Sequence, residues 1–388
     1  MRPLSLDGDY SVDQGRTDPH SATEVSMRAG RPVTLADVAR EAGVAKSTAS
    51  YAFSNPGRLA VDTTRRVREA AERLGYSGPS ALGRALASGR TSVVAVVTRA
   101  LLEAPDTDPH ALQVIDGLSR ELASLGYGVL LLPPITDDAT HKLHAGAMYD
   151  AAVTVRRIDG IAQTDAMLAQ RGVPWVRLDG IPDEDKAVAM DSATPSMEIL
   201  QALCESGHKR IATVALKLNL DDHPMNIVAG ADAKALIDGL PSSVPQKVSR
   251  ARIEAFARLG VAPSHVASCE IVTREDGHAA GMAMLSLPAH ERPTAIVCQA
   301  DVYAWGVIDA AHELGLRVPE DVSVTGFDGL LGGVFDELNL TTVVQDGATK
   351  GRLIARWVTL ASTKPDAPQP FDLPLTVRWG STSGPAPA

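Results

Sequence analysis

Hydrophobic residues between positions 34 and 75 recur at steps of three and four, which is the spacing of one face of a helix. Gly43 falls between two such segments, where a tight turn is required, and Asp62 is the predicted N-cap of a third. The expected inward residues of the three short helices are Leu35, Val38, Ala39 and Ala42; Ala49, Ala52 and Phe53; and Val67, Ala70, Ala71 and Leu74. The first two helices and their turn have the form of a helix-turn-helix.

From residue 92 onward, short apolar runs alternate with longer amphipathic stretches. Helices are predicted over stretches such as 110–126 and 303–315. The runs typical of buried strands are 92–97, 127–133, 159–164, 174–180, 210–216, 294–300 and 322–329. Alternating strands and helices form parallel sheets covered on both faces. About 300 residues are more than a single hydrophobic core usually holds. We therefore expect an α/β core of two doubly wound parallel-sheet lobes, preceded by an all-α headpiece.

The second of the three short helices has one face with few apolar side chains. Ala45, Lys46, Ser47, Ser50 and Tyr51 occupy that face. In a helix-turn-helix the second helix lies in the major groove, where small and polar side chains meet base edges and phosphates. DNA binding is therefore predicted here, and an ordinary helical hairpin is the alternative.

The charge distribution favours the same interpretation. Residues 31–90 hold ten basic and five acidic residues, a net charge of +5, whereas the whole chain carries −10. A basic module on an acidic body is typical of a nucleic-acid binder, although a solvated helical surface would give the same count.

Composition argues against several other classes. The 388 residues are 45% hydrophobic, with no apolar run long enough for a membrane helix. Three widely spaced cysteines predict neither a disulfide frame nor a zinc site, and the lack of a secretory signal indicates the cytoplasm. His141 and His144 lack a third metal ligand nearby and are predicted to lie on a solvated surface. No metal and no cofactor is expected.

Two distant stretches carry a resemblance to a known family. "TLADVAREAGVAKSTASYAF" (34–53) with "RRVREAAERLGY" (65–76) resembles the headpiece of the lactose-repressor (LacI/GalR) family of bacterial transcription regulators. "RPTAIVCQADVYAWGVIDAAHELGLRVPEDVSVTGFDG" (292–329) resembles that family's most recognisable run. The resemblance covers roughly residues 32–384 and implies a headpiece on a periplasmic-binding-protein-like core.

The resemblance implies individual DNA contacts. Lys46 and Ser47 correspond to the two main base-reading positions, and Tyr51 to a third, where many relatives have an Arg that reads guanine. Phosphate contacts are implied at Thr34, Ser50 and Thr63. In the family's hinge helix, which folds on DNA, a Leu enters the minor groove; Leu86 aligns with it, and Ser80 replaces the usual Asn.

The resemblance also implies the domain organisation. The expected parts are a disordered tail (1–31), the headpiece (32–78), the hinge helix (79–90) and an effector-binding core (91–388). Within the core, an N-lobe of about 91–192 and 346–362 and a C-lobe of about 193–345 and 363–388 are expected. A ligand would bind between the lobes, at the carboxyl ends of the strands.

Four residues correspond to the family's ligand positions: Asp179, Arg252, Asp328 and Gln345. Their charged groups make strong hydrogen bonds to hydroxyls, which favours a sugar or sugar-like effector. Gly277 stands where some sugar-binding relatives stack an aromatic ring, so a nucleoside or a phosphorylated ligand is the alternative.

The resemblance predicts a homodimeric, sequence-specific repressor, with double-stranded operator DNA and a small-molecule effector as partners and no membrane association. The alternative is a purely ligand-binding protein or an enzyme of periplasmic-binding fold with no operator. "GVAKST" (43–48) faintly resembles the end of a phosphate-binding loop, but Ala45 replaces the Gly before Lys and the first Gly is missing. A non-enzyme is therefore expected.

Overall fold

The computed structural model describes residues 33–54, 56–78, 83, 85, 88–98, 109–154, 161–178, 190–216, 218, 225–239, 247–269, 272–364 and 373–387. The chain divides into two compact units, Met1–Gly83 and Arg84–Ala388. The predicted tail (1–31), Ser80, Leu86 and Asp179 lie outside the described residues.

The described residues of 33–78 form three helices, as the hydrophobic spacing predicts. They are α1 (Leu35–Glu41), α2 (Lys46–Ser54) and α3 (Val61–Leu74), with a short 3-10 turn at Pro56–Arg58. Their shared core consists of Val38, Ala39, Ala49, Ala52, Val67, Ala70 and Ala71. Gly43 and Gly75 end α1 and α3 with positive φ angles of 65° and 69°, a conformation that glycine adopts without strain.

The predicted N-cap of α3 is wrong by two residues. Ala60 occupies the N-cap, and Asp62 lies inside the first turn, where its carboxylate is 2.5 Å from Arg65. An acid in the first turn interacts favourably with the helix dipole. An Asp near a helix start is therefore compatible with either position.

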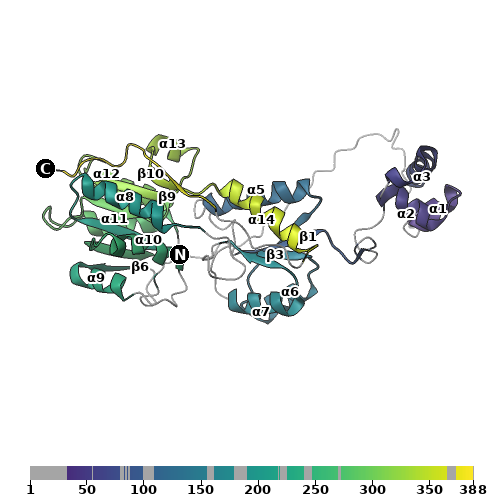
Figure 1. Cartoon of the computed structure of the whole chain (residues 1–388), viewed down its shortest axis with the longest axis horizontal. Coiled ribbons are helices and arrows are strands. Elements are labelled where there is room, and N and C mark those ends of the chain that lie inside the picture. Colours follow the sequence, from purple (N-terminus) through teal and green to yellow (C-terminus); the bar gives the residue numbers. More distant parts are fainter. Residues whose placement is uncertain are drawn as a thin grey trace, which may run out of the picture. The chain divides into compact units, whose positions relative to one another are not determined.

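The second unit begins with a small parallel sheet in the order β2-β1-β3-β4 (Figure 1). Its strands are β1 (Val93–Val97), β2 (Gly128–Leu132), β3 (Ala151–Thr154) and β4 (Trp175–Arg177). The helices α5 (Pro109–Ser124) and α14 (Gly347–Ala361) cover one face, and α7 (Ile161–Arg171) covers the other. A further helix, α6 (Asp138–Gly146), precedes β3.

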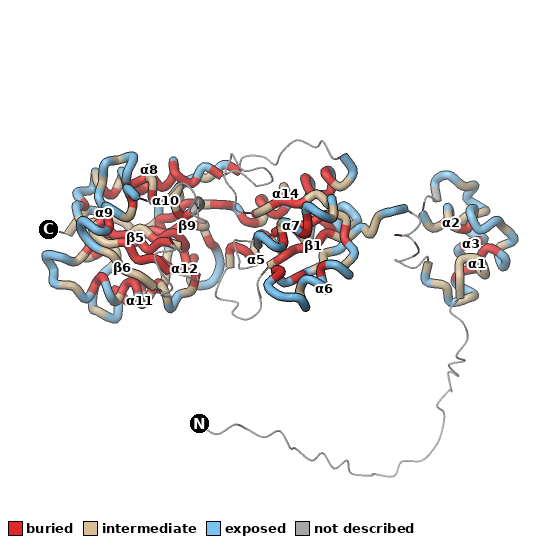
Figure 2. The backbone as a smooth tube through the Cα atoms, turned by 90° about the horizontal axis from the view of Figure 1, so that it is seen from below, coloured by how far each residue is buried: buried red, intermediate tan, exposed pale blue. Residues whose placement is uncertain are grey.

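The larger sheet has the order β11-β10-β9-β8-β5-β7-β6, and its strands are mostly buried (Figure 2). Its strands are β5 (Ile211–Leu216), β6 (Met225–Ala229), β7 (His265–Cys269), β8 (Ala295–Cys298), β9 (Ser323–Asp328), β10 (Thr341–Val344) and β11 (Thr376–Arg378). The pairings among the inner strands are parallel, as predicted, whereas the edge strands β6 and β11 pair antiparallel.

Within the described ranges, six helices accompany the larger sheet: α8 (Ala193–Glu205), α9 (Gly230–Asp238), α10 (Lys247–Arg258), α11 (Arg274–Leu285), α12 (Asp301–Glu313) and α13 (Val334–Leu338). One core lies between the sheet and α11 and α12, and another between the sheet and α8 and α10. The two cores cover opposite faces of the sheet.

Two sequence-based expectations for this unit are wrong. The run 159–164 was expected to be a strand, but α7 begins at Ile161, and the strand of this region is β3 at Ala151–Thr154. Two of the four residues of β3 are Ala, which is depleted in strands, so its pattern is weak. His144 is fully buried rather than solvated, with its Nε2 2.6 Å from the Pro133 carbonyl oxygen.

Candidate DNA interface and effector site

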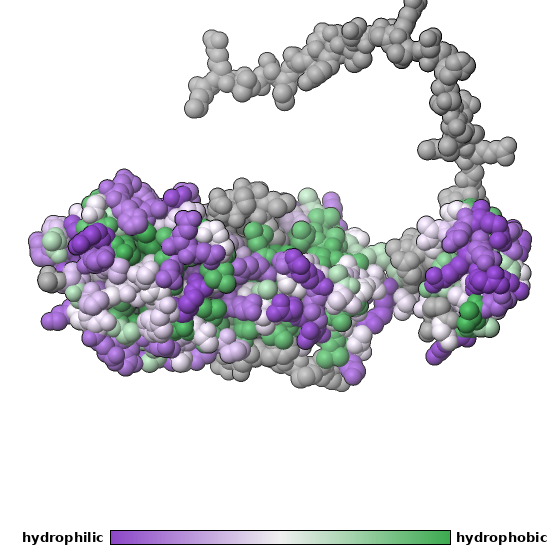
Figure 3. Space-filling view, turned by 90° about the horizontal axis from the view of Figure 1, so that it is seen from above, coloured by the Kyte–Doolittle hydropathy of each residue, from purple (hydrophilic) through white to green (hydrophobic). Residues whose placement is uncertain are grey.

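The predicted reading face of α2 is exposed in the structure. Ala45, Lys46 and Ser47 are exposed, and Tyr51 retains 45% of its accessible surface. On the opposite side of the same helix, Ala49 and Ala52 are completely buried against α1 and α3. The surface of the first unit is largely hydrophilic (Figure 3). The side chains that pack and those that face solvent are therefore separated as a DNA-reading helix requires.

The residues predicted to contact phosphates have different surroundings. The Thr34 hydroxyl donates to Asp37 at 2.6 Å, and the Thr34 backbone N–H donates to the same carboxylate oxygen at 3.0 Å. Because its only proton is used inside the protein, this hydroxyl is a poor donor to a phosphate. Ser50 and Thr63 are half-buried, with Thr63 in the first turn of α3.

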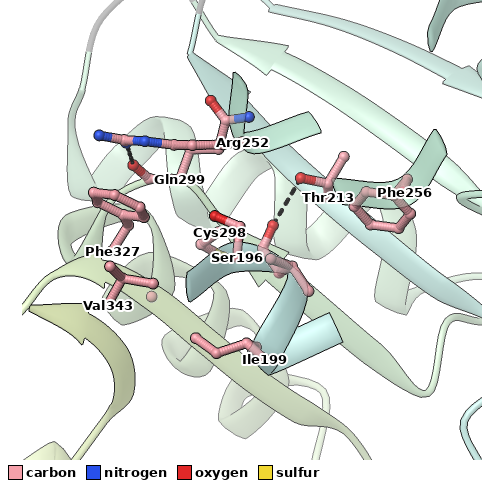
Figure 4. Close-up of a pocket in the computed structure, with 11 residues that line it drawn as sticks. Ser196, Ile199, Thr213, Arg252, Phe256, Cys298, Gln299, Phe327 and Val343 are labelled. Atoms are coloured by element: carbon pink, nitrogen blue, oxygen red, sulfur yellow. Dashed lines mark hydrogen bonds between the residues drawn. The ribbon is translucent and has the colours of Figure 1, made fainter. Parts of the chain in front are cut away.

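Arg252 lies at the carboxyl edge of the larger sheet. It projects from α10, is 7% exposed, and donates from Nη1 to the Gln299 carbonyl oxygen at 2.5 Å. Its guanidinium carbon lies 3.3 Å from the centroid of the Phe327 ring (Figure 4). The Gln299 side chain is fixed in turn by Ser249, through bonds of 2.7 and 3.1 Å. The guanidinium is thus held by an aromatic ring and a backbone carbonyl.

Asp328 and Gln345 form a pair on neighbouring strands. Asp328 ends β9 and Gln345 directly follows β10; the Gln345 amide donates to the Asp328 carboxylate at 2.5 Å. Asp328 has a φ of 130°, a strained conformation for a residue with a side chain. Gln345 is 4% exposed, and its Oε1 accepts no hydrogen bond within the described part of the chain. A buried amide oxygen of this kind gains from a ligand that donates a hydrogen bond.

Three of the four predicted effector residues therefore lie on adjoining elements. The ring of Phe327 contacts the Arg252 guanidinium, and Phe327 directly precedes Asp328. Asp328 in turn accepts a hydrogen bond from Gln345. A small, largely apolar pocket adjoins Arg252 and Phe327 between the sheet and α8 and α10 (Figure 4). Together these groups offer a cationic donor, a carboxylate and an amide acceptor to a polar ligand.

Asp301 is a buried acid that the sequence-based reasoning did not select. It is fully buried and accepts from the Thr342 hydroxyl at 2.5 Å and the Leu330 N–H at 2.7 Å. Burial raises the pKa of this carboxyl group to about 6. A Cβ on Gly326 would lie 2.1 Å from Asp301 Oδ1, so the carboxylate needs a glycine there. It fixes the loop after Asp328. In the sequence it lies two residues before the predicted helix 303–315, and no motif marks it.

Gly277 is not part of this site. It lies in α11, where an added Cβ would be 2.4 Å from the carbonyl oxygen of Tyr303 in α12. The glycine permits close packing of two helices, so an aromatic ring could not occupy this position without separating them.

The described residues lack the features of a metal site and of a membrane span. Those residues contain no group of three or more His, Cys, Asp or Glu side chains suited to hold a metal ion. Within the same ranges, none of the helices is both long and apolar enough to span a membrane.

Comparison with known proteins links both units to regulators. Residues 34–78 match the model of bacterial regulatory proteins of the lacI family, and residues 200–383 match a periplasmic binding protein-like domain. An HTH-type transcriptional regulator of Mycobacterium tuberculosis is 30% identical over 332 residues, covering 83% of this chain and 89% of the relative. The repressor CytR of Escherichia coli K12 is 29% identical, covering 82% and 86%.

Solved structures show the same fold. The lac repressor dimer bound to operator and the anti-inducer ONPF has a TM-score of 0.71 and 23% identity, covering 91% of this chain and 100% of that one. The regulator CelR in complex with cellobiose has a TM-score of 0.59 and 24% identity over the same shares.

Proposed function

Because the chain belongs to the LacI family of bacterial regulatory proteins, we propose that it represses transcription by binding an operator through α2. The observation that carries this proposal is the exposed polar face of α2 opposite its buried alanines. Lys46 and Ser47 read base edges, Tyr51 contacts a third base pair, and Ser50 and Thr63 contact phosphates. At Thr34, the backbone N–H groups of the first turn of α1 take the place of the hydroxyl.

The linker and the two lobes complete the regulator. Residues 79–90 form a hinge in which Leu86 enters the minor groove and Ser80 contributes to the DNA contacts. The small sheet with α14 forms the N-lobe, and the larger sheet forms the C-lobe. The packing of α14 on α5, directly after β10 of the larger sheet, supports the assignment of 346–362 to the N-lobe.

The effector binds against Arg252, Asp328 and Gln345, with Asp179 as a fourth contact. We propose a sugar or a sugar-like metabolite, because hydroxyl groups can both accept from Arg252 and donate to the Gln345 oxygen. Asp301 supports the site by fixing the loop after Asp328. The complex of CelR with cellobiose is consistent with this chemistry in the same fold.

The regulator acts as a homodimer on a pseudo-palindromic operator. One three-helix headpiece offers little contact area, and two half-sites multiply the discrimination. The lac repressor dimer on its operator supports this assembly. We propose no enzymatic activity, because the matched family consists of transcription regulators.

The deciding experiment is a gel shift with DNA from upstream of the protein's own gene, in the presence of excess unrelated DNA. Specific retardation, followed by footprinting of two symmetric half-sites, is the expected result. A sugar-binding protein or an enzyme would give no specific shift. A screen of sugars, nucleosides and sugar phosphates on the shifted complex then identifies the effector class.

A further inference from the structure

Arg90, the last residue of the hinge, and the two residues after it are fixed at two points. Arg90 Nη2 donates to both the carbonyl and the hydroxyl oxygen of Ser362, at 3.0 Å each. The Asp150 carboxylate accepts from the Thr91 N–H at 2.7 Å, the Thr91 hydroxyl at 2.8 Å and the Ser92 N–H at 2.9 Å. We refer to these five residues as the exit clamp. Ser92 has a φ of 55°, so the clamp holds a backbone conformation that is unfavourable by itself.

One helix connects the exit clamp with the effector site. Ser362 is the C-cap of α14, and Asp346 is its N-cap, directly after Gln345. The 15 residues of α14 span about 22 Å at the usual helical rise. Gln345 bonds to Asp328 at one end of this helix, and Arg90 bonds to Ser362 at the other.

The packing of α14 makes it a rigid connection. An added Cβ on Gly351 would lie 2.1 Å from the Val114 carbonyl oxygen, and one on Gly117 would lie 2.2 Å from that of Ala348. The Arg356 Nε is 2.7 Å from the Glu121 Oε1 of α5. Figure 1 shows the two helices side by side on the small sheet. Since their backbones are in close contact, α14 cannot bend or rotate without displacing α5.

We propose that α14 transmits the state of the effector site to the hinge, and that Arg90 is the positioning residue that receives it. This inference rests on the proposed function. A displacement of Gln345 moves the amino end of α14, and the whole helix carries the displacement to Ser362. Arg90 suits this role because its Nη2 reaches both Ser362 oxygens and its charge interacts favourably with the carboxyl end of a helix. The coupling is reciprocal, so operator binding must also alter the amino end of α14.

The test uses the full-length protein and the operator fragment defined by footprinting. Amide hydrogen exchange is measured over residues 343–351 with and without saturating operator, and with unrelated DNA of equal length. In the wild-type protein, operator should change exchange there by about fivefold or more, the lower end of typical couplings. In Arg90→Ala, at operator concentrations that keep the variant fully bound, the change should disappear.

Two further variants separate positioning from charge and from folding. Arg120→Ala removes an equally cationic side chain of α5, which pairs with Asp116 at 2.8 Å, and should retain the wild-type change. Arg90→Lys should give an intermediate change, because the lysine keeps the charge but its side chain is one atom shorter and reaches the Ser362 oxygens less readily. A wild-type change in Arg90→Ala overturns the inference while the proposed function stands. If no upstream fragment binds specifically, the proposed function is overturned and this inference with it.

Discussion

The guanidinium carbon of Arg252 lies 3.3 Å from the centroid of the Phe327 ring, while Nη1 of the same group donates to the Gln299 carbonyl oxygen. The ring and the carbonyl together hold the guanidinium at the carboxyl edge of the larger sheet, where Asp328 follows Phe327 and bonds to Gln345. A cation held in this way keeps its orientation before a ligand arrives, which lowers the entropy that binding costs. The predictions for the effector site follow from this geometry.

Arg252→Ala should abolish the response of operator binding to the effector identified by the screen. Operator binding without effector should stay within about twofold, whereas the wild-type response should be in the range of about 5–150-fold. The reason is that α10 belongs to the second unit and the reading helix to the first. Operator titrations by fluorescence anisotropy, with and without effector, measure both quantities. An unchanged midpoint and amplitude would show that Arg252 is only structural.

Phe327→Leu should lower the affinity for the effector less than Arg252→Ala does. Leu keeps an apolar side chain under the guanidinium but removes a cation–π interaction of about 0.5–2 kcal/mol, which corresponds to about 2–30-fold in affinity. Isothermal titration calorimetry gives the affinity, and thermal unfolding of the same sample detects any loss of stability. Wild-type affinity in a fully folded variant would contradict the role assigned to the ring.

His208 makes the stability of the second unit depend on pH. It lies 2.9 Å from the Thr294 hydroxyl and 3.0 Å from the Gly384 carbonyl oxygen, and burial lowers the pKa of its ring from the ordinary 6.5. The folded state therefore holds this ring neutral. When the pH falls below about 6.5, the unfolded chain takes up a proton that the folded chain resists. The contribution of His208 to the free energy of unfolding is therefore fully present above that pH and decreases as the pH falls below it.

The measurement is urea unfolding between pH 5.5 and 7.5, comparing the wild-type protein with His208→Gln. The variant should unfold more easily at pH 7.5, because Gln fills the ring's site imperfectly, but its stability should fall less between pH 7.5 and 5.5. Parallel pH profiles for the two proteins would rule out His208 as the source of the dependence.

The sequence predicted the elements with strong periodicity and missed those whose residues have weak preferences. The three headpiece helices and α12 follow clear spacing, whereas β3 has an Ala-rich sequence that resembles a helix segment as much as a strand. The packing of α14 on α5 depends on residues such as Glu121 and Arg356, which are 235 positions apart. No local pattern reports a contact of that kind, and a resemblance to a family was needed to assign α14 to the N-lobe.

The candidate effector site was likewise predicted only in part. Arg252, Asp328 and Gln345 were selected by resemblance, and the structure brings them together at one edge of the sheet. Phe327, Gln299 and Asp301 were missed, because a strand residue, an amide and a helix-terminal acid have ordinary roles in most folds. Their contribution follows from what lies beside them, such as the Leu330 N–H at 2.7 Å from Asp301.

Gly351→Ala tests the close contact between α14 and α5. The added methyl group would lie 2.1 Å from the Val114 carbonyl oxygen, so the helices must separate, at a cost of about 1–3 kcal/mol. Gly146→Ala is a matched control, since this glycine also lies in a helix and has nothing within 4 Å of the added carbon. It should unfold at an equal or slightly higher urea concentration than the wild-type protein. Equal midpoints for both variants would contradict the tight packing.

Lys46→Ala should lower both the affinity and the base preference of the headpiece. Lys46 is the first residue of α2, is exposed, and stands beside Ser47 and Tyr51 on the face opposite Ala49. A lysine at the amino end of a reading helix reaches the guanine O6 and N7 acceptors in the major groove. A single lost base contact costs about 1–3 kcal/mol on the correct sequence and less on unrelated DNA.

The discriminating measurement is the salt dependence of binding to operator and to scrambled DNA. Each phosphate contact contributes a slope of about 0.9 in log affinity against log salt, whereas a base contact contributes little to that slope. Lys46→Ala should therefore keep the wild-type slope and lose affinity mainly for operator. Arg40 is exposed on α1 and paired with Asp37 at 3.3 Å, so it offers a control on the same unit. Arg40→Ala should change the affinity for operator and for scrambled DNA equally. If Lys46→Ala lowered the slope by about 0.9 and weakened both DNAs alike, Lys46 would be a phosphate contact, and base reading would fall to Ser47 and Tyr51.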